Sequence, residues 1–454
     1  MRRITLHDTR SGTRRRLVPR NPGRVGVYAC GPTVYGRIHV GNARPYVVFS
    51  LLKRFLEHER YRVTLVVNIT DVNDQIYDAA RKAGVPSAQL AAEMSDHYRA
   101  DTDRLRLGRP DHEPLASETI EAIVGLIGEL IERGHAYVAD GDVYFAVRSD
   151  PGYGRLSHRD PDEMDQGEGL EGSERKRDPL DFALWKARKE GEDTAWDSPW
   201  GPGRPGWHIE CSAMAEQLLG VGFEVHGGGS DLIFPHHENE AAQTRAARGE
   251  ELAGIWMHNG MVQLEEQKMA KSVGNIRLLH VALGEYGRDA LVMYMCGGHY
   301  RQPLAFSAAQ LEEAASRVAR LREAGRRLTP GASPTDLAPL CERFFDALAG
   351  DFNTAEALAA AFEWVREANR RLEAGETVGN ADLREMLGVL GLDNLLAAGP
   401  DEEPDARVRE LVERRERARR ERDFAAADRL RAQVEALGWE IRDRAAGPEV
   451  VRRP

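Results

Sequence analysis

A strand–helix–strand pattern near the start of the chain is the feature that most constrains the fold. Residues 25–29 and 62–69 are short runs rich in β-branched residues, and residues 45–59 between them show helical periodicity through Val48, Leu51, Leu52 and Phe55. Two strands joined so closely by a helix form a βαβ unit, in which the strands are parallel and the crossover is right-handed. The sequence therefore predicts an α/β fold on a parallel sheet, where ligands bind at the carboxyl ends of the strands.

Length and composition indicate a globular protein with more than one domain. The chain has 454 residues, of which 42% are hydrophobic and 30% charged. No run approaches roughly 18 apolar residues, and the first residues lack the apolar core of a signal peptide, so we expect a cytoplasmic protein without a membrane segment. The net charge of −11 argues against a nonspecific DNA coat but not against a nucleic-acid partner, because binding needs only a local basic stripe.

Residues 201–240 gather the side-chain types of a metal site. They contain a thiol, two adjacent imidazoles and two carboxylates, namely Cys211, His236, His237, Glu238 and Glu240. Such a set suits Zn²⁺, and a helix begun after Pro235 would place His236 and Glu240 on one face because they are four residues apart. The four cysteines of the chain lie far apart, which argues against a disulfide framework and leaves metal binding or catalysis open.

Two further segments are candidates for binding phosphate. The string HVGN at residues 39–42 lies between the first predicted strand and its helix, where a helix N-terminus offers free N–H groups. The polar segment 267–275 carries Lys268 and Lys271, which can clamp polyphosphate oxygens. Taken singly, each segment fits an ordinary βα loop or a solvated loop better.

The rest of the chain separates into an insertion and a helical C-terminal half. Between the two parts of the sheet we expect helices at 87–107 and 117–133, a hairpin at 135–147 that turns at Asp140 and Gly141, and a charged loop at 159–178. Ala, Leu, Arg and Glu recur at helical spacing over residues 307–327 and 336–396. Beyond a linker at 399–404, we expect two short helices at 405–420 and 423–437 and a strand at 439–442.

Taken together, these strings resemble one enzyme family. HVGN at 39–42 with KMAKS at 268–272 resembles the paired nucleotide-binding signatures of class I aminoacyl-tRNA synthetases. YACGPTVY at 28–35, GWHIECS at 206–212 and FPHHENE at 234–240 are similar to strings of the cysteinyl-tRNA synthetases in particular, as are NITD at 68–71 and GHYR at 298–301. The likeness runs from about residue 3 to the C-terminus and is densest between residues 28 and 301.

The resemblance implies an α/β architecture with a split catalytic domain. A Rossmann-like parallel-sheet domain is expected at 1–115 and 200–265, interrupted by a connective domain at 116–199. A stem-contact region with the KMAKS loop follows at 266–310, then a helical bundle at 311–400. A small C-terminal α/β module at 401–454 is expected to bind the anticodon.

The resemblance also implies a set of site residues. One Zn²⁺ is expected at the floor of the amino-acid pocket, held by Cys30, Cys211, His236 and Glu240, where it would bind the thiolate of the substrate. His237 and Glu238 are expected to point elsewhere and are not assigned to the metal. The cysteine pocket is expected to contain Thr33, Trp207, His208 and Asp231, with Asp231 accepting hydrogen bonds from the ammonium group.

ATP would be bound beside this pocket by His39 and Asn42 at a helix N-terminus and by Lys268 and Lys271 at the pyrophosphate, together with Mg²⁺. The activity implied is ATP-dependent ligation of L-cysteine to its cognate tRNA through cysteinyl-adenylate, by a monomer. Two alternatives stay open. One is a ligase that joins cysteine to an amino sugar in thiol-cofactor synthesis, and the other is a non-catalytic paralogue that binds thiols through zinc or binds tRNA.

The chain departs from the family pattern at three positions. Ala270 stands in the KMAKS loop where Ser is usual, so one hydroxyl is lost. Asn73 and Gln75 stand where acidic and basic residues are usual, and no role is assigned to them.

Near the C-terminus, arginines 414, 415, 417, 419 and 420 form a basic cluster that fits either a tRNA contact or a solvated helix face.

Overall fold

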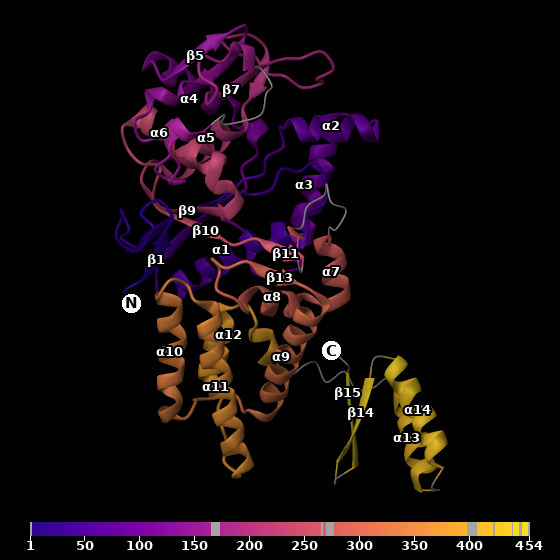
Figure 1. The fold of residues 1–454 in the computed structure, drawn as a ribbon. Coiled ribbons are helices and arrows are strands. Elements are labelled where there is room, and N and C mark those ends of the chain that lie inside the picture. Colours follow the sequence, from indigo (N-terminus) through magenta and orange to yellow (C-terminus); the bar gives the residue numbers. More distant parts are fainter. Residues whose placement is uncertain are drawn as a thin grey trace. The chain divides into compact units, whose positions relative to one another are not determined.

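The computed structural model describes residues 2–164, 173–264, 267–268, 277–396, 406–420, 423–437, 439–444 and 447–452. The chain forms two compact units (Figure 1). The larger comprises Met1–Val318 and Pro330–Asp393, and the smaller comprises Ala319–Thr329 and Asn394–Pro454.

The larger unit is built on a four-stranded sheet in the order β10-β9-β3-β4, and every neighbouring pair is parallel. The strands are β3 (Arg24–Ala29), β4 (Arg62–Val67), β9 (Phe223–Gly229) and β10 (Ala253–Asn259). β9 is buried along its whole length, as expected for a parallel strand covered on both faces. The predicted strands at 25–29 and 62–69 are confirmed, and so is a parallel sheet interrupted by a long insertion.

The crossover helix α1 (Val40–His58) joins β3 to β4 and contacts all four strands. It begins five residues earlier than the periodicity predicts, so that HVGN forms the N-cap and first turn and not a loop. The His39 ring accepts a hydrogen bond from the backbone N–H of Asn42, and the Asn42 side chain accepts one from the backbone N–H of His39. This reciprocal capping satisfies two N–H groups and sets the helix start at Val40, five residues before the predicted start at Pro45.

Two helices follow β4, namely α2 (Asp74–Ala83) and α3 (Ser87–Asp103). The sequence pattern predicted the second helix but not the first. The signals for α2 were present, because Asn73 caps its N-terminus by accepting from the N–H of Gln75, and Gly84 ends it with a positive φ. Asn73 therefore has a structural role.

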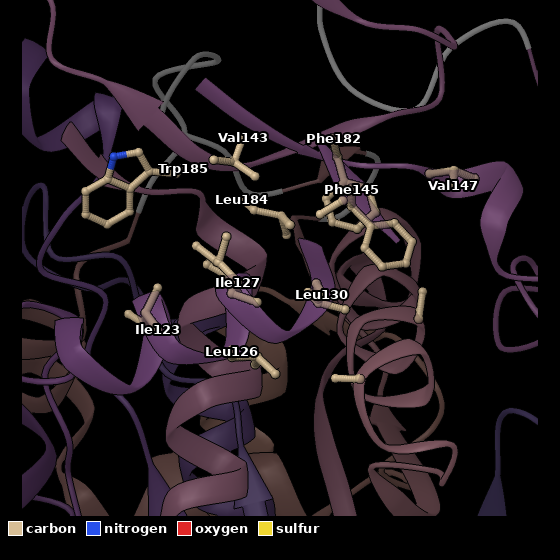
Figure 2. Packing of buried hydrophobic residues seen from close by; sticks show 14 of the residues in the cluster. Ile123, Leu126, Ile127, Leu130, Val143, Phe145, Val147, Phe182, Leu184 and Trp185 are labelled. Carbon is tan, nitrogen blue, oxygen red and sulfur yellow. The ribbon is translucent and has the colours of Figure 1, made fainter. Parts of the chain in front are cut away.

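The insertion has its own sheet, in the antiparallel order β5-β6-β7-β8. Its elements are α4 (Ile120–Glu132), β5 (Ala136–Ala139), β6 (Asp142–Phe145), β7 (Phe182–Ala187) and β8 (Gly203–Pro205). The hairpin predicted around Asp140 and Gly141 is confirmed, and both residues have positive φ. Figure 2 shows the core, where leucines and isoleucines of α4 face Phe145, Phe182 and Leu184 of the sheet.

Two helices return the chain from the insertion to the parallel sheet. They are α5 (Trp207–Leu219), which leads into β9, and α6 (Glu238–Arg248), which leads into β10 and is preceded by a short helical segment at Ile233–His237. A two-stranded antiparallel sheet of β1 (Thr5–Asp8) and β2 (Thr13–Arg16) completes the N-terminal part.

A second small sheet, in the order β12-β11-β13, follows the parallel one. Its strands are β11 (Val262–Leu264), β12 (Gln267–Lys268) and β13 (Leu304–Phe306), and α7 (Leu279–Tyr286) and α8 (Arg288–Cys296) lie between β12 and β13 in the chain. The helices predicted beyond residue 306 are α9 (Ala308–Arg327), α10 (Ala338–Ala349), α11 (Thr354–Glu373) and α12 (Ala381–Val389).

The smaller unit contains α13 (Ala406–Arg420), α14 (Phe424–Ala436) and an antiparallel hairpin of β14 (Trp439–Arg444) and β15 (Gly447–Arg452). Its core includes Val408, Val434 and Ile441, which are fully buried. The two helices and the first strand agree with the sequence-based prediction, but the second strand was not predicted. Among the helices that the structure describes, none has the length and apolar character needed to span a membrane.

Candidate metal centre and nucleotide site

Four predicted metal ligands from distant parts of the sequence come together in one buried cluster. Cys30 follows β3 at the carboxyl edge of the sheet, and Cys211 lies on α5. His236 lies in the short helical segment just ahead of α6, and Glu240 lies in the first turn of α6. Their ligand atoms all lie within 4.8 Å of one another, and all four side chains are buried. Both cysteines are free thiols.

The distances within this cluster suit a tetrahedral ion. Two sulfurs bound at roughly 2.3 Å to a tetrahedral Zn²⁺ lie about 3.8 Å apart, and the Cys30 and Cys211 sulfurs are 3.8 Å apart. Nitrogen and oxygen ligands at roughly 2.0–2.1 Å lie about 3.3 Å apart, and His236 Nε2 is 3.2 Å from Glu240 Oε1. The donor set of two thiols, an imidazole and a carboxylate therefore fits zinc in both type and spacing.

Burial opposes charge on the groups of this cluster. Burial raises the pKa of the Cys30 thiol well above its usual range and lowers that of His236 far below its usual value. A neutral imidazole is the form that binds metal. Nδ1 of His236 lies 2.9 Å from Nδ1 of His208, so Nε2 of His236 faces the cluster. A bound cation would offset the cost of burying the thiolates and the carboxylate.

A second group of possible ligands shares Cys30 and Glu240 but adds His226 and His237. The expectation that His237 points elsewhere is wrong, because its Nε2 lies 3.3 Å from the Cys30 sulfur. The expectation for Glu238 is confirmed, since its carboxylate accepts a hydrogen bond from the N–H of Ser157 at 2.7 Å. Because the two groups share Cys30 and Glu240, the cluster contains more possible ligands than the four that the sequence indicated.

His226 is the site residue that sequence reasoning missed. It lies on β9 directly opposite Tyr28 of β3, and its Nε2 is 3.7 Å from the Cys30 sulfur. Its place follows from the pairing of β9 with β3, which are separated by the whole insertion. The usable signal was a histidine three residues ahead of the end of a buried strand that leads into Asp231.

Close packing at the sheet edge lets Cys30 reach this position. A Cβ atom on Gly31 would lie 1.8 Å from the carbonyl oxygen of Asn68, and one on Gly227 would lie 2.1 Å from the ring of Phe49. The backbone N–H of Cys30 donates to the carbonyl of Gly227 at 2.9 Å. Glycine is therefore required at both positions for the strand ends to approach.

The predicted pocket residues lie around the cluster to different degrees. The Trp207 ring stacks on His236 with 4.2 Å between ring centroids, and His208 is buried beside both. Thr33 follows Cys30 at the same sheet edge, where its backbone pairs with Thr70. Asp231 is exposed in the turn that follows β9.

The predicted nucleotide-binding residues belong to two segments that are joined at the N-terminus of α1. Asn42 is exposed in the first turn, and His39 caps it. The backbone of Lys268 pairs with that of Gln263 in β11. The backbone N–H of Val40 donates to the backbone carbonyl of Arg277 at 3.0 Å. The Lys268 side chain, Ala270 and Lys271 lie outside the described residues.

Known proteins resemble the chain along nearly its whole length. Residues 16–316 match the family described as tRNA synthetases class I (C) catalytic domain, and residues 343–394 match the DALR domain. A cysteine–tRNA ligase from Caldicellulosiruptor saccharolyticus is 42% identical over 465 residues, covering 99% of this chain and 100% of the relative. One from Alkalilimnicola ehrlichii is 45% identical, covering 98% of each.

Solved structures share the fold at low sequence identity. Methionyl-tRNA synthetase from Mycobacterium tuberculosis, in complex with methionyl-adenylate, has a TM-score of 0.61 and 18% identity, covering 82% of this chain and 90% of that one. A LeuRS from Agrobacterium radiobacter has a TM-score of 0.60 and 13% identity, covering 84% of each chain.

The split parallel sheet, its antiparallel insertion and the match over residues 16–316 define the class as the class I aminoacyl-tRNA synthetases. The chain is 42% and 45% identical to two cysteine–tRNA ligases over nearly its full length, which identifies the family within this class. The chain belongs to the cysteinyl-tRNA synthetases.

Proposed function

We propose that this protein ligates L-cysteine to its cognate tRNA in two ATP-dependent steps. The observation that carries the proposal is the buried cluster of Cys30, Cys211, His236 and Glu240 at the carboxyl edge of the parallel sheet. The cluster lies in a chain similar over its full length to cysteine–tRNA ligases, including the C-terminal part that an amino-sugar ligase has no evident need for.

Zinc is the metal we assign to this cluster, one ion per chain, bound by those four residues. When bound, it supplies a soft Lewis acid that lowers the pKa of a substrate thiol and binds its thiolate. His208 would hold the His236 ring through the contact between their Nδ1 atoms. Serine has a hydroxyl of much higher pKa and cannot offer the same bond, which is the basis for selecting cysteine.

The remaining pocket residues would orient the amino acid above this floor. Trp207 stacks on His236 and forms a wall against which the substrate methylene can pack. Asp231, exposed at the end of β9, would accept hydrogen bonds from the substrate ammonium group. Thr33 and His208 would complete the pocket.

ATP would bind at the N-terminus of α1. His39 and Asn42 would contact its phosphates, and Lys268 and Lys271 with Mg²⁺ would stabilise charge on the departing pyrophosphate. The substrate carboxylate attacks the α-phosphorus in line, so that a carboxylate–phosphorus bond forms as the bond to pyrophosphate breaks. A ribose hydroxyl of the terminal adenosine of tRNA then attacks the carbonyl carbon, and AMP leaves.

The other parts of the chain would serve tRNA. We assign residues 1–115 and 200–265 to catalysis, 116–199 to the connective insertion, 266–310 to stem contact, 311–400 to the bundle and 401–454 to the anticodon. We further propose that the enzyme is cytoplasmic and acts as a monomer. Light scattering of the purified protein tests the oligomeric state.

One assay separates this function from its two alternatives. The purified protein is supplied with ATP, labelled pyrophosphate and cysteine, and then with cysteine tRNA or an amino-sugar acceptor. We expect cysteine-dependent exchange followed by transfer to tRNA. Transfer to the sugar alone would identify the amino-sugar ligase, and the absence of exchange would identify a binding protein.

A further inference from the structure

Arg44, on the second turn of α1, is a buried cation whose hydrogen bonds all go to backbone carbonyls. Its Nη1 donates to Gly260 at 2.5 Å and to Met261 at 3.2 Å. Its Nη2 donates to Tyr300 at 3.1 Å, to Gln302 at 2.7 Å and to His299 at 3.4 Å. The side chain is fully buried, and burial lowers its pKa to about 10.

These carbonyls belong to the two backbone segments that open the small sheet. Gly260 and Met261 lead directly into β11, and residues 299–302 lead into β13, which pairs with β11 in parallel. The segments approach so closely that a Cβ on Gly260 would lie 2.4 Å from the carbonyl group of Gln302. Arg44 therefore ties both segments to the helix that His39 caps and whose first turn contains Asn42.

Three of the five carbonyls that Arg44 contacts, those of Gly260, Met261 and Tyr300, also accept a hydrogen bond from another donor. The Gly260 carbonyl also accepts from the Asn259 side chain at 3.1 Å, and the Met261 carbonyl accepts from the N–H of Leu304 at 2.9 Å. The Tyr300 carbonyl likewise accepts from the N–H of Gly260 at 2.8 Å. A guanidinium buried without a carboxylate partner is costly, so a role in local folding alone explains its presence poorly.

Arg44 lies between the start of α1 and the small sheet that holds the backbone of Lys268. β11 holds the backbone of Lys268 through its pairing with β12. Downstream, Arg277 and Leu278 pair with the backbone of residues 39–40 at the start of α1. The segment that contains both signature lysines is thus joined to the α1 N-terminus at its downstream end, and Arg44 makes the corresponding link upstream.

We propose that Arg44 is a positioning residue for adenylate formation, which fixes β11, and through it Lys268, relative to His39 and Asn42. The inference rests on the proposed function. Displacement of a charge-stabilising lysine by about 1 Å is enough to lower the rate of a positioned reaction by roughly a hundredfold. The loss should fall on turnover and not on cysteine binding, because Arg44 touches neither the metal cluster nor the pocket residues.

The test is cysteine-dependent pyrophosphate exchange by Arg44→Gln and Arg44→Lys. For Arg44→Gln we expect kcat to fall by roughly 30- to 100-fold with KM for cysteine within about twofold of the parent and zinc content unchanged. Lysine keeps the charge and three donors but not the fork, so Arg44→Lys should recover part of the rate.

Arg54→Gln is the matched control. Arg54 lies on the same helix and also donates to a backbone carbonyl, that of Gly388, at 3.0 and 2.6 Å, but on the side of the helical bundle. The variant Arg54→Gln should lower Tm and leave kcat within about twofold of the parent. If Arg44→Gln behaves like this control, with a lower Tm and unchanged kcat, the inference is wrong while the proposed function stands. A parent protein without exchange would overturn both.

Discussion

At the scale of single residues, the four cysteines of this chain divide into two kinds. Cys296 and Cys341 are buried thiols on α8 and α10. Cys30 and Cys211 are equally buried but face each other at 3.8 Å with a carboxylate and an imidazole alongside. Burial alone thus cannot identify a ligand, and the neighbours of each thiol decide its role.

Replacing one thiol of each kind tests this distinction. Cys211→Ser removes a soft ligand from the cluster, so we predict that bound zinc falls from about one per chain to less than roughly a tenth after dialysis. Cys341→Ser should keep its zinc. Metal analysis by mass spectrometry measures both, and undiminished zinc in Cys211→Ser would remove the basis of the metal assignment.

The second ligand group calls for its own comparison. His236 belongs to the group with two thiols, and His226 belongs to the group with two imidazoles. We predict that His236→Gln loses zinc like Cys211→Ser and that His226→Gln retains it, because Zn²⁺ held by two thiolates binds more tightly than by one. The reverse result would move the ion to the second group.

At the scale of helices and strands, sequence patterns predicted what depends on nearby residues. The strands at 25–29 and 62–69 and the hairpin at Asp140 and Gly141 were found because their signals are local. The helix start at Val40 was misplaced because the cap depends on hydrogen bonds between His39 and Asn42 that no periodicity reveals. His226 was missed because its neighbour Cys30 lies across a strand pairing that spans the insertion.

The ligand set itself was predicted only through the family resemblance. Residues 201–240 supplied Cys211, His236 and Glu240, but nothing local links them to Cys30. That link depends on β3 and β9 being adjacent in the sheet, which brings the end of β3 beside α5 and α6.

One carboxylate of α2 pairs with two cations on strands of the insertion. Asp74 pairs with Lys186 of β7 at 2.9 Å and with Arg204 of β8. Burial alone would raise its pKa, but the two cations outweigh burial and lower it. A group with a lowered folded-state pKa contributes stability above its unfolded pKa and loses it as the pH falls through the folded value.

We therefore predict that Asp74→Asn lowers the free energy of unfolding by about 1 kcal/mol at pH 7, and that the difference from the parent shrinks below about pH 4. Asp78→Asn is the control, since Asp78 lies on the same helix in an exposed pair with Arg81. Denaturant unfolding at several pH values provides the measurement. A difference that grows as the pH falls would contradict the ion-pair explanation.

At the scale of the whole molecule, the two compact units suggest a division of labour. The proposed chemistry uses residues of the larger unit, whereas α13, α14 and the β14–β15 hairpin pack around a separate core. Within the predicted arginine cluster, the Arg415 side chain is 5% exposed and paired with Glu416, while Arg414 is 57% exposed and Arg419 is 39% exposed. A tRNA contact would use the exposed members.

Deleting residues 401–454 separates these roles. We predict that cysteine-dependent pyrophosphate exchange stays within about twofold of the parent, because the metal cluster and α1 are untouched. The kcat/KM for charging tRNA should fall by at least roughly tenfold, which corresponds to about 1.4 kcal/mol of lost transition-state binding. Unchanged charging would exclude a contribution of this segment to tRNA binding.

The most direct test of the central claim is the ratio of kcat/KM for cysteine to that for serine in pyrophosphate exchange by the zinc-loaded protein. The two amino acids differ only at the atom that would meet the ion bound by Cys30, Cys211, His236 and Glu240. A site built around that bond should favour cysteine by at least roughly 10⁴-fold. Serine exchange within about tenfold of cysteine would contradict recognition of the thiol by this cluster.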